Sequence, residues 1–354
     1  MNTNNGTKRI EWIDALRGFT MFLVVHSHVE VLGMDIPAHI SGLNSVVTLF
    51  FMPLFFFISG FFAYRANDTL NFKSYSANML KKLRVLTIPT LFFGFLYATT
   101  LYALKNNISP SESIVVFFNH DMKLGYWFTE ALLIMFIIYY TISFLLRKRK
   151  LITRQVVLVA IAFLLLKLQK YTLTNNNQIV DWFCLKHIFT YFQYFVFVII
   201  ISCYRNKAFK LLENDIIGGC IILLFAGLYI LHHWEVNFFP KKIQTYTIAY
   251  LGILMTINIF RHYSNFFSSK TKIGRGLQYI GRRTLDVYLI HYFFIPTIPF
   301  LGVFFMKHNI FILQSSTAII LSLLIILFTL IVSNIIRTSP FLAYWLLGVK
   351  RDKK

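Results

Sequence analysis

Apolar stretches long enough to cross a bilayer recur along almost the whole of this 354-residue sequence. A helix needs about 20 residues to cross the hydrocarbon core. Lipid offers no partners to backbone amides, so only helices or closed barrels can span it, and these stretches lack the alternating polarity of barrel strands. We therefore expect an all-α polytopic bundle of about ten transmembrane helices, at residues 12–32, 43–63, 86–104, 126–146, 155–169, 187–203, 216–232, 243–260, 285–305 and 316–336.

The composition agrees with a chain whose solvent is mostly lipid. Hydrophobic residues make up 57% of the chain, charged residues make up 14%, and the mean hydropathy is +0.62, which excludes a soluble helical fold of average composition. The longest polar stretches, at 65–85, 105–125 and 261–284, are expected to be loops. No linker or internal repeat divides the sequence, so we expect a single membrane domain over residues 1–354.

The distribution of charge explains the net charge of +21. With the N-terminus inside, the segments on the inner side of the membrane hold 27 of the 35 Lys and Arg residues. This positive-inside bias predicts an even number of spans and two cytoplasmic termini. The basic residues do not gather on one face, so we expect no nucleic-acid partner.

Polar residues inside a span are costly and are therefore candidates for function. The first span holds Asp14, Arg17, His26, His28 and Glu30. In a helix, Arg17 and His28 lie within about 20° of one another and roughly 16 Å apart, whereas His26 lies about half a turn from Arg17. A stripe thus runs from a cation at the cytoplasmic end to a deep imidazole. The alternative is that Arg17 only snorkels and that His28 only bonds a neighbouring helix.

Five segments, in this order, resemble the acyltransferase-3 family of membrane acyltransferases. In the first segment, Arg17 and His28 match the family's pattern of a basic residue, ten residues and a His. The other four are PLFFFISG at 53–60, KKLRVLTIP at 81–89, YWFTEALL at 126–133 and YIGRRTLDVYLIH at 279–291. The second is closest to the sugar O-acetylase branch, while Lys81 and Lys82 stand where Arg is more usual.

The resemblance implies an enzyme that transfers an acyl group, commonly acetyl, from cytoplasmic acyl-CoA to a sugar hydroxyl on or across the membrane. We expect a multi-pass protein of the bacterial inner membrane whose partners are membrane lipid, acyl-CoA and a glycan acceptor. Acetyl-CoA would be a co-substrate, and no permanently bound cofactor is expected. The acyl group, the acceptor glycan, homo-oligomer formation and glycan-assembly partners stay open.

Acylation chemistry suggests roles for the matched residues. A sugar hydroxyl loses its proton as it attacks a thioester, and a neutral imidazole suits that proton near pH 7, so we expect His28 to be the base. Acyl-CoA carries phosphates, which Arg17 would bind together with a basic cluster of Lys81, Lys82 and Arg84. For any single loop cation, the topological bias is the alternative explanation.

Glu130, at the outer start of the fourth span, is the second predicted catalytic residue. It would orient His28 or bind sugar hydroxyls, and the alternative is a solvated acid near a helix N-terminus. Trp127, Tyr288 and His291 are predicted to line the substrate site. Tyr288 and His291 share a helix face, where a packed polar pair is the alternative.

Other features have plainer explanations. His26 and Glu30 are spaced i to i+4 and are expected to bond each other or an adjacent helix. Ser59 and Gly60 are expected to let two helices approach closely, and Ser59 is not expected to be a nucleophile. The cysteines lack metal-ligand spacing and no nucleotide-binding loop is present, so we expect no metal and no nucleotide other than CoA.

Two other functions remain open at this stage. A transporter or flippase of a lipid-linked glycan would have a similar number of helices and a few buried charges. It would not need the stripe from Arg17 to His28. A non-catalytic partner of a polysaccharide-synthesis complex is the third possibility, which dispensability of His28 would favour.

The charge distribution makes the topology testable. Reporter fusions after residues 70, 150 and 270 should report the cytoplasm, and fusions near residues 38 and 115 should report the outside. A fusion after residue 150 that reports the outside would overturn the orientation and the side from which CoA enters.

Overall fold

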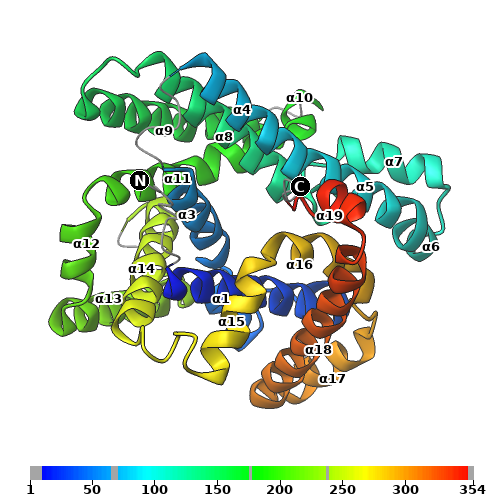
Figure 1. The fold of residues 1–354 in the computed structure, drawn as a ribbon. Helices are drawn as coiled ribbons and strands as arrows, with labels where there is room; N and C mark the ends of the chain where they lie inside the picture. The colour runs from blue at the N-terminus through cyan, green and yellow to red at the C-terminus, as the bar shows by residue number, and fades with distance from the viewer. Residues whose placement is uncertain (1–9, 65–70, 175–177, 237–238, 350–354) are drawn as a thin grey trace. The chain divides into compact units, whose positions relative to one another are not determined.

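The computed structural model describes residues 10–64, 71–174, 178–236 and 239–349, and every regular element in these ranges is a helix (Figure 1). The predicted all-α class is confirmed. The described chain forms two compact units. The first unit lies within Met1–Met52, Asn206–Thr284 and Ile298–Leu323, and the second lies within Pro53–Arg205, Leu285–Thr297 and Leu324–Lys354.

The first unit is built around the N-terminal helix. Its helices are α1 (Glu11–His28), α2 (Gly42–Val47), α12 (Arg205–Leu212), α13 (Asp215–His233), α14 (Lys241–His262), α15 (Lys272–Arg282), α17 (Pro299–His308) and the first part of α18 (Phe311–Arg337).

The second unit contains the central helices and the C-terminal part of the chain. Its helices are α3 (Phe51–Ala63), α4 (Phe72–Lys82), α5 (Ile88–Tyr97), α6 (Ala103–Asn106), α7 (Pro110–Asn119), α8 (Trp127–Leu145), α9 (Leu151–Thr174), α10 (Gln178–Trp182), α11 (Leu185–Cys203), α16 (Thr284–Ile290), α19 (Pro340–Leu346) and the rest of α18.

Seven of the helices in the described ranges are long and apolar enough to cross a membrane. They correspond to seven of the ten predicted spans and run over Phe72–Asn106, Trp127–Leu145, Leu151–Lys170, Leu185–Cys203, Asp215–His233, Lys241–His262 and Phe311–Arg337. The predicted first span is also one helical run, because α1 continues into the π-helical segment Val29–Gly33. The chain is therefore a multi-pass helical membrane protein.

Two predicted spans are divided. The span at 43–63 is split into α2 and the 13-residue α3, and the Thr48 hydroxyl at the break bonds the Asn44 carbonyl at 2.7 Å. Such back-bonding bends helices. The span at 285–305 is interrupted between α16 and α17 at 295–298. Pro296 cannot donate a helical hydrogen bond, and Pro299 starts the next helix.

The prediction that the longest polar stretches are loops is wrong. The helices α4, α7 and α15 lie inside these three stretches. Each begins at a polar cap, since Asn71, Ser109 and Thr271 accept backbone N–H bonds at 2.8, 3.2 and 2.9 Å. These three segments are polar, so a search for apolar runs does not find them, although the caps are visible in the sequence. Helix α4 is the polar first part of the long helix Phe72–Asn106.

Helices α1 and α15 cross in direct backbone contact inside the first unit (Figure 1). A Cβ on Gly281 would lie 1.8 Å from the Asp14 carbonyl oxygen, and one on Gly18 would lie 1.9 Å from the Leu277 carbonyl oxygen. Only glycine fits at either position. In the second unit, a Cβ on Gly60 would lie 2.5 Å from the Phe195 carbonyl oxygen. The prediction that Gly60 lets two helices approach closely is confirmed.

The cytoplasmic start predicted for α1 is tied to the segment before α15. The Glu11 carboxylate accepts hydrogen bonds from the Ser269 backbone N–H at 2.9 Å and from its hydroxyl at 2.8 Å. These two bonds hold the pKa of Glu11 below its ordinary value. The crossing of α1 and α15 is thus fixed at one end by polar bonds and in the middle by glycine contact.

Gly281→Ala should destabilise the protein, because the added methyl group has no space against the Asp14 backbone. We expect a loss of about 1–3 kcal/mol, read as a lower thermal unfolding temperature of the purified protein. Gly276→Ala on the same helix is the matched control, since nothing lies within 4 Å of its added Cβ. Equal unfolding temperatures for the two variants would contradict the close crossing.

Candidate functional site

The stripe predicted on the first helix is carried by one uninterrupted α-helix. Helix α1 runs from Glu11 to His28 without a break, so the helical geometry that relates Arg17 to His28 applies. Arg17 and His28 are both half-buried, whereas His26 is fully buried. The two histidines therefore lie in different surroundings, as their positions on the helix require.

The Arg17 guanidinium contacts Thr284 and Asp14. Its Nη2 donates a hydrogen bond to Thr284 Oγ1 at 2.8 Å, and its Nη1 lies 4.0 Å from Asp14 Oδ1. Thr284 follows α15, whose Gly281 contacts α1. The first and last of the five sequence motifs thus meet at Arg17. Sequence reasoning assigned no role to Thr284, because its bond with Arg17 depends on the crossing of two distant helices.

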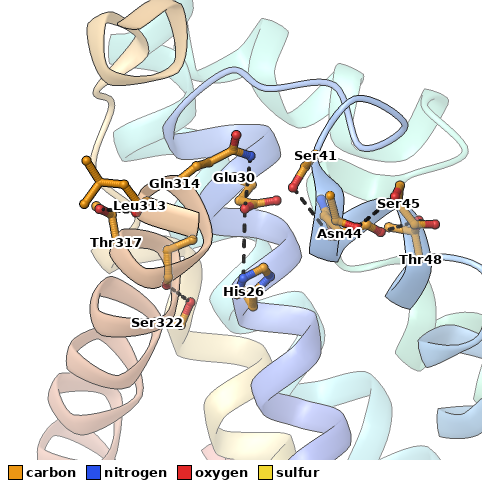
Figure 2. A network of polar contacts seen from close by, with 12 residues as sticks. His26, Glu30, Ser41, Asn44, Ser45, Thr48, Leu313, Gln314, Thr317 and Ser322 are labelled. Atoms are coloured by element: carbon orange, nitrogen blue, oxygen red, sulfur yellow. Dashed lines mark hydrogen bonds and ion pairs between the residues drawn. The ribbon is translucent and has the colours of Figure 1, made fainter. Parts of the chain in front are cut away.

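His26 and Glu30 lie in a separate polar cluster (Figure 2). His26 Nε2 is 4.0 Å from Glu30 Oε1, and Gln314 Nε2 donates to the same oxygen at 3.3 Å. His26 and Glu30 are fully buried, and Gln314 is almost so. The expectation that His26 and Glu30 pair with each other or with another helix is confirmed. These residues hold α1 and its π-helical extension against α18.

The predicted basic cluster lies in the second unit. Lys81 is exposed, whereas the Lys82 ammonium lies over the Phe136 ring at 3.6 Å from its centroid. Arg84 donates to the Tyr344 carbonyl at 2.7 Å and stacks on the Tyr344 ring. Arg84 therefore joins α19 to the long helix Phe72–Asn106. To bind phosphate as predicted, Arg84 would have to give up this contact or share it with the ligand.

Glu130 lines a cavity of about 600 Å³ in the second unit. Its carboxylate accepts a weak bond from the Cys184 thiol at 3.7 Å and is attracted by Lys123, which is 2% exposed. Sequence reasoning missed Lys123. Its signal in the sequence was a basic residue in a predicted outer segment, where the positive-inside bias disfavours lysine.

The predicted substrate-site aromatics pack around the start of α8. The Tyr288 hydroxyl donates to the Gly125 carbonyl at 2.8 Å and accepts from the Phe128 N–H at 3.2 Å. Trp127 stacks on His187 with ring centroids 3.9 Å apart. His291 is fully buried, and its Nδ1 lies 2.9 Å from two backbone carbonyls of its own helix. Tyr288 and His291 thus bond backbone groups, and their place in the substrate site stays a prediction.

Comparison with protein families gives a match over nearly the whole chain. A family model described as an acyltransferase domain matches residues 10–338, a range that contains all five motif segments from Arg17 to His291. Comparisons with curated proteins and with solved structures gave no match. The chain therefore belongs to the acyltransferase-3 family of membrane acyltransferases.

Proposed function

We propose that this acyltransferase moves an acetyl group from cytoplasmic acetyl-CoA to a sugar hydroxyl of an exported or cell-surface glycan, in the bacterial inner membrane. The observation that carries the proposal is the stripe on α1. Arg17 stands at the predicted cytoplasmic end, bonded to Thr284, and His28 lies eleven residues further on the same face. The donor's phosphates would bind at one end, and its thioester would reach the other.

His28 is the proposed general base. The sugar oxygen forms a bond to the thioester carbonyl carbon, the carbon–sulfur bond breaks, and the hydroxyl proton passes to the imidazole. The CoA sulfur leaves as a thiolate, to which the imidazolium returns the proton. An imidazole is suited to both transfers because its ordinary pKa lies close to neutral pH.

Arg17 is the proposed anchor for the CoA phosphates. Its guanidinium forms bidentate, charge-assisted bonds with phosphate oxygens better than an ammonium does. The Thr284 hydroxyl accepts a hydrogen bond from one guanidinium nitrogen and so orients the planar group. Lys81, Lys82 and Arg84 are proposed to add longer-range attraction for the polyanion. Glu130 is proposed to bind hydroxyls of the acceptor.

Arg17→Ala should lower the affinity for CoA by about 10- to 100-fold, because a charge-assisted bond contributes about 1.5–3 kcal/mol. Arg17→Lys should have an intermediate effect, since it keeps the charge and loses the planar fork. Binding of CoA to the purified protein measures both. Thr284→Val is the control, because it removes the bond to Arg17 and keeps the cation. Unchanged affinity in a folded Arg17→Ala protein would leave snorkelling as the explanation of Arg17.

His28→Ala should reduce acyl transfer by about 10²- to 10⁴-fold while CoA binding and thermal stability are kept. The rate is measured as thiol release from acetyl-CoA by membranes that contain equal amounts of protein.

His26→Ala is the matched control, for which we expect a loss of stability and little loss of activity. It removes a buried partner of Glu30, so it should lower the unfolding temperature, at a cost of about 1–3 kcal/mol, and leave most of the activity per folded molecule. Equal losses of specific activity in the two variants would indicate that both histidines are structural.

A further inference from the structure

The cavity beside Glu130 has a polar end and an apolar end. Along α8, its wall is formed by Glu130, Leu133, Ile134 and Ile137, which share one helix face. Glu130 lies in the first turn of α8, and Ile137 lies about 10 Å further along the axis. The wall therefore changes from a carboxylate to branched aliphatic side chains over two turns.

Another part of the wall comes from the long helix Phe72–Asn106. Leu86, Thr87, Thr90 and Leu91 contribute to it, and Thr90 Oγ1 donates to Thr129 Oγ1 of α8 at 2.8 Å. Asn119, which accepts a hydrogen bond from Trp182, and Lys123, which attracts Glu130, also line the cavity. Aromatic side chains complete the lining, at Phe117, Phe118, Trp182 and Phe183. The volume of about 600 Å³ is typical of a site for one small ligand.

An unusual turn forms the polar end. Lys123, Leu124 and Gly125 all have left-handed backbone conformations, with φ values of 47°, 52° and 103°. Two of the three are not glycine, and such strain is found most often at functional sites. Tyr288 and Tyr292 hold the turn by donating hydroxyl hydrogen bonds to the Gly125 carbonyl at 2.8 and 3.1 Å. The result is a buried lysine, which also donates to the Phe118 carbonyl, at the cavity wall.

We propose that this cavity binds one sugar-headed amphiphile, with its hydroxyl-bearing head at Asn119, Lys123 and Glu130 and its hydrocarbon chain along Leu86, Ile134 and Ile137. The site would hold a lipid-linked glycan acceptor, a substrate class that rests on the acyltransferase function proposed above. A carboxylate, an amide and an ammonium supply both donors and acceptors for sugar hydroxyls.

The charges disfavour two other occupants. Acyl-CoA carries several phosphates, whereas the cavity wall has one ammonium, which is bonded to Phe118 and lies near an acid. A phospholipid phosphate would meet the same carboxylate. The apolar wall also disfavours a free sugar as the occupant, because aliphatic side chains offer no hydrogen-bond partners for its hydroxyls.

Photolabelling tests the site without any acyl transfer. The probe is a long-chain alkyl glucoside with a diazirine in its chain, photolysed on the full-length protein in phosphatidylcholine nanodiscs. We expect the label in peptides that cover residues 86–91 and 133–137. Ile134→Trp should lower this labelling by about tenfold, since each excluded methylene group weakens binding about fourfold. Leu145→Trp, on the same helix but 67% exposed, is the control and should label as the wild type does.

Competition identifies the head group. Unlabelled alkyl glucoside should displace the probe at lower concentrations than free glucose or a phosphocholine of the same chain, and Glu130→Gln should reduce that preference severalfold. Equal competition by the phosphocholine, equal competition by glucose, or labelling unaffected by Ile134→Trp would each overturn the proposal. His28→Ala should label normally, so a failure of the acyltransferase mechanism would not be mistaken for a failure of this site.

Discussion

The backbone contact between α1 and α15 is the constraint on which the candidate site depends. Lipid gives apolar helices little reason to associate, so membrane helices rely on close van der Waals packing at small residues. Gly18 and Gly281 allow that approach, and Thr284 lies three residues after Gly281. The contact therefore brings a hydroxyl to the Arg17 guanidinium and fixes the orientation of the cation that is proposed to bind CoA.

The same helix carries a buried polar cluster that is separate from the proposed catalytic stripe. His26 lies 4.0 Å from Glu30, to which Gln314 donates a hydrogen bond, in a buried cluster (Figure 2). His28 is half-buried on the side of Arg17. Polar groups inside a membrane are costly and rarely face lipid, so each of these positions is a candidate for a structural or a functional role. Two residues of separation place the two imidazoles in these different surroundings.

Features that lie within a single helix could be predicted from the sequence. The long apolar spans, the stripe from Arg17 to His28 and the pairing of His26 with Glu30 need only helical periodicity. The helices α4, α7 and α15 were missed because their capping residues, such as Ser109 with Glu112, lie outside apolar runs. The bond between Arg17 and Thr284 and the cavity near Lys123 depend on distant segments and on a left-handed turn, which no local pattern reports.

The most direct test of the account is the chemical state of the glycan itself. Mass spectrometry would compare cell-surface and lipid-linked glycans from cells with the wild-type protein, without it, and with His28→Ala at equal membrane abundance. The account predicts an acetyl ester on a sugar hydroxyl in the wild type that is absent from the other two. Identical glycans in all three would contradict the proposed activity, and an ester retained with His28→Ala would contradict His28 as the base.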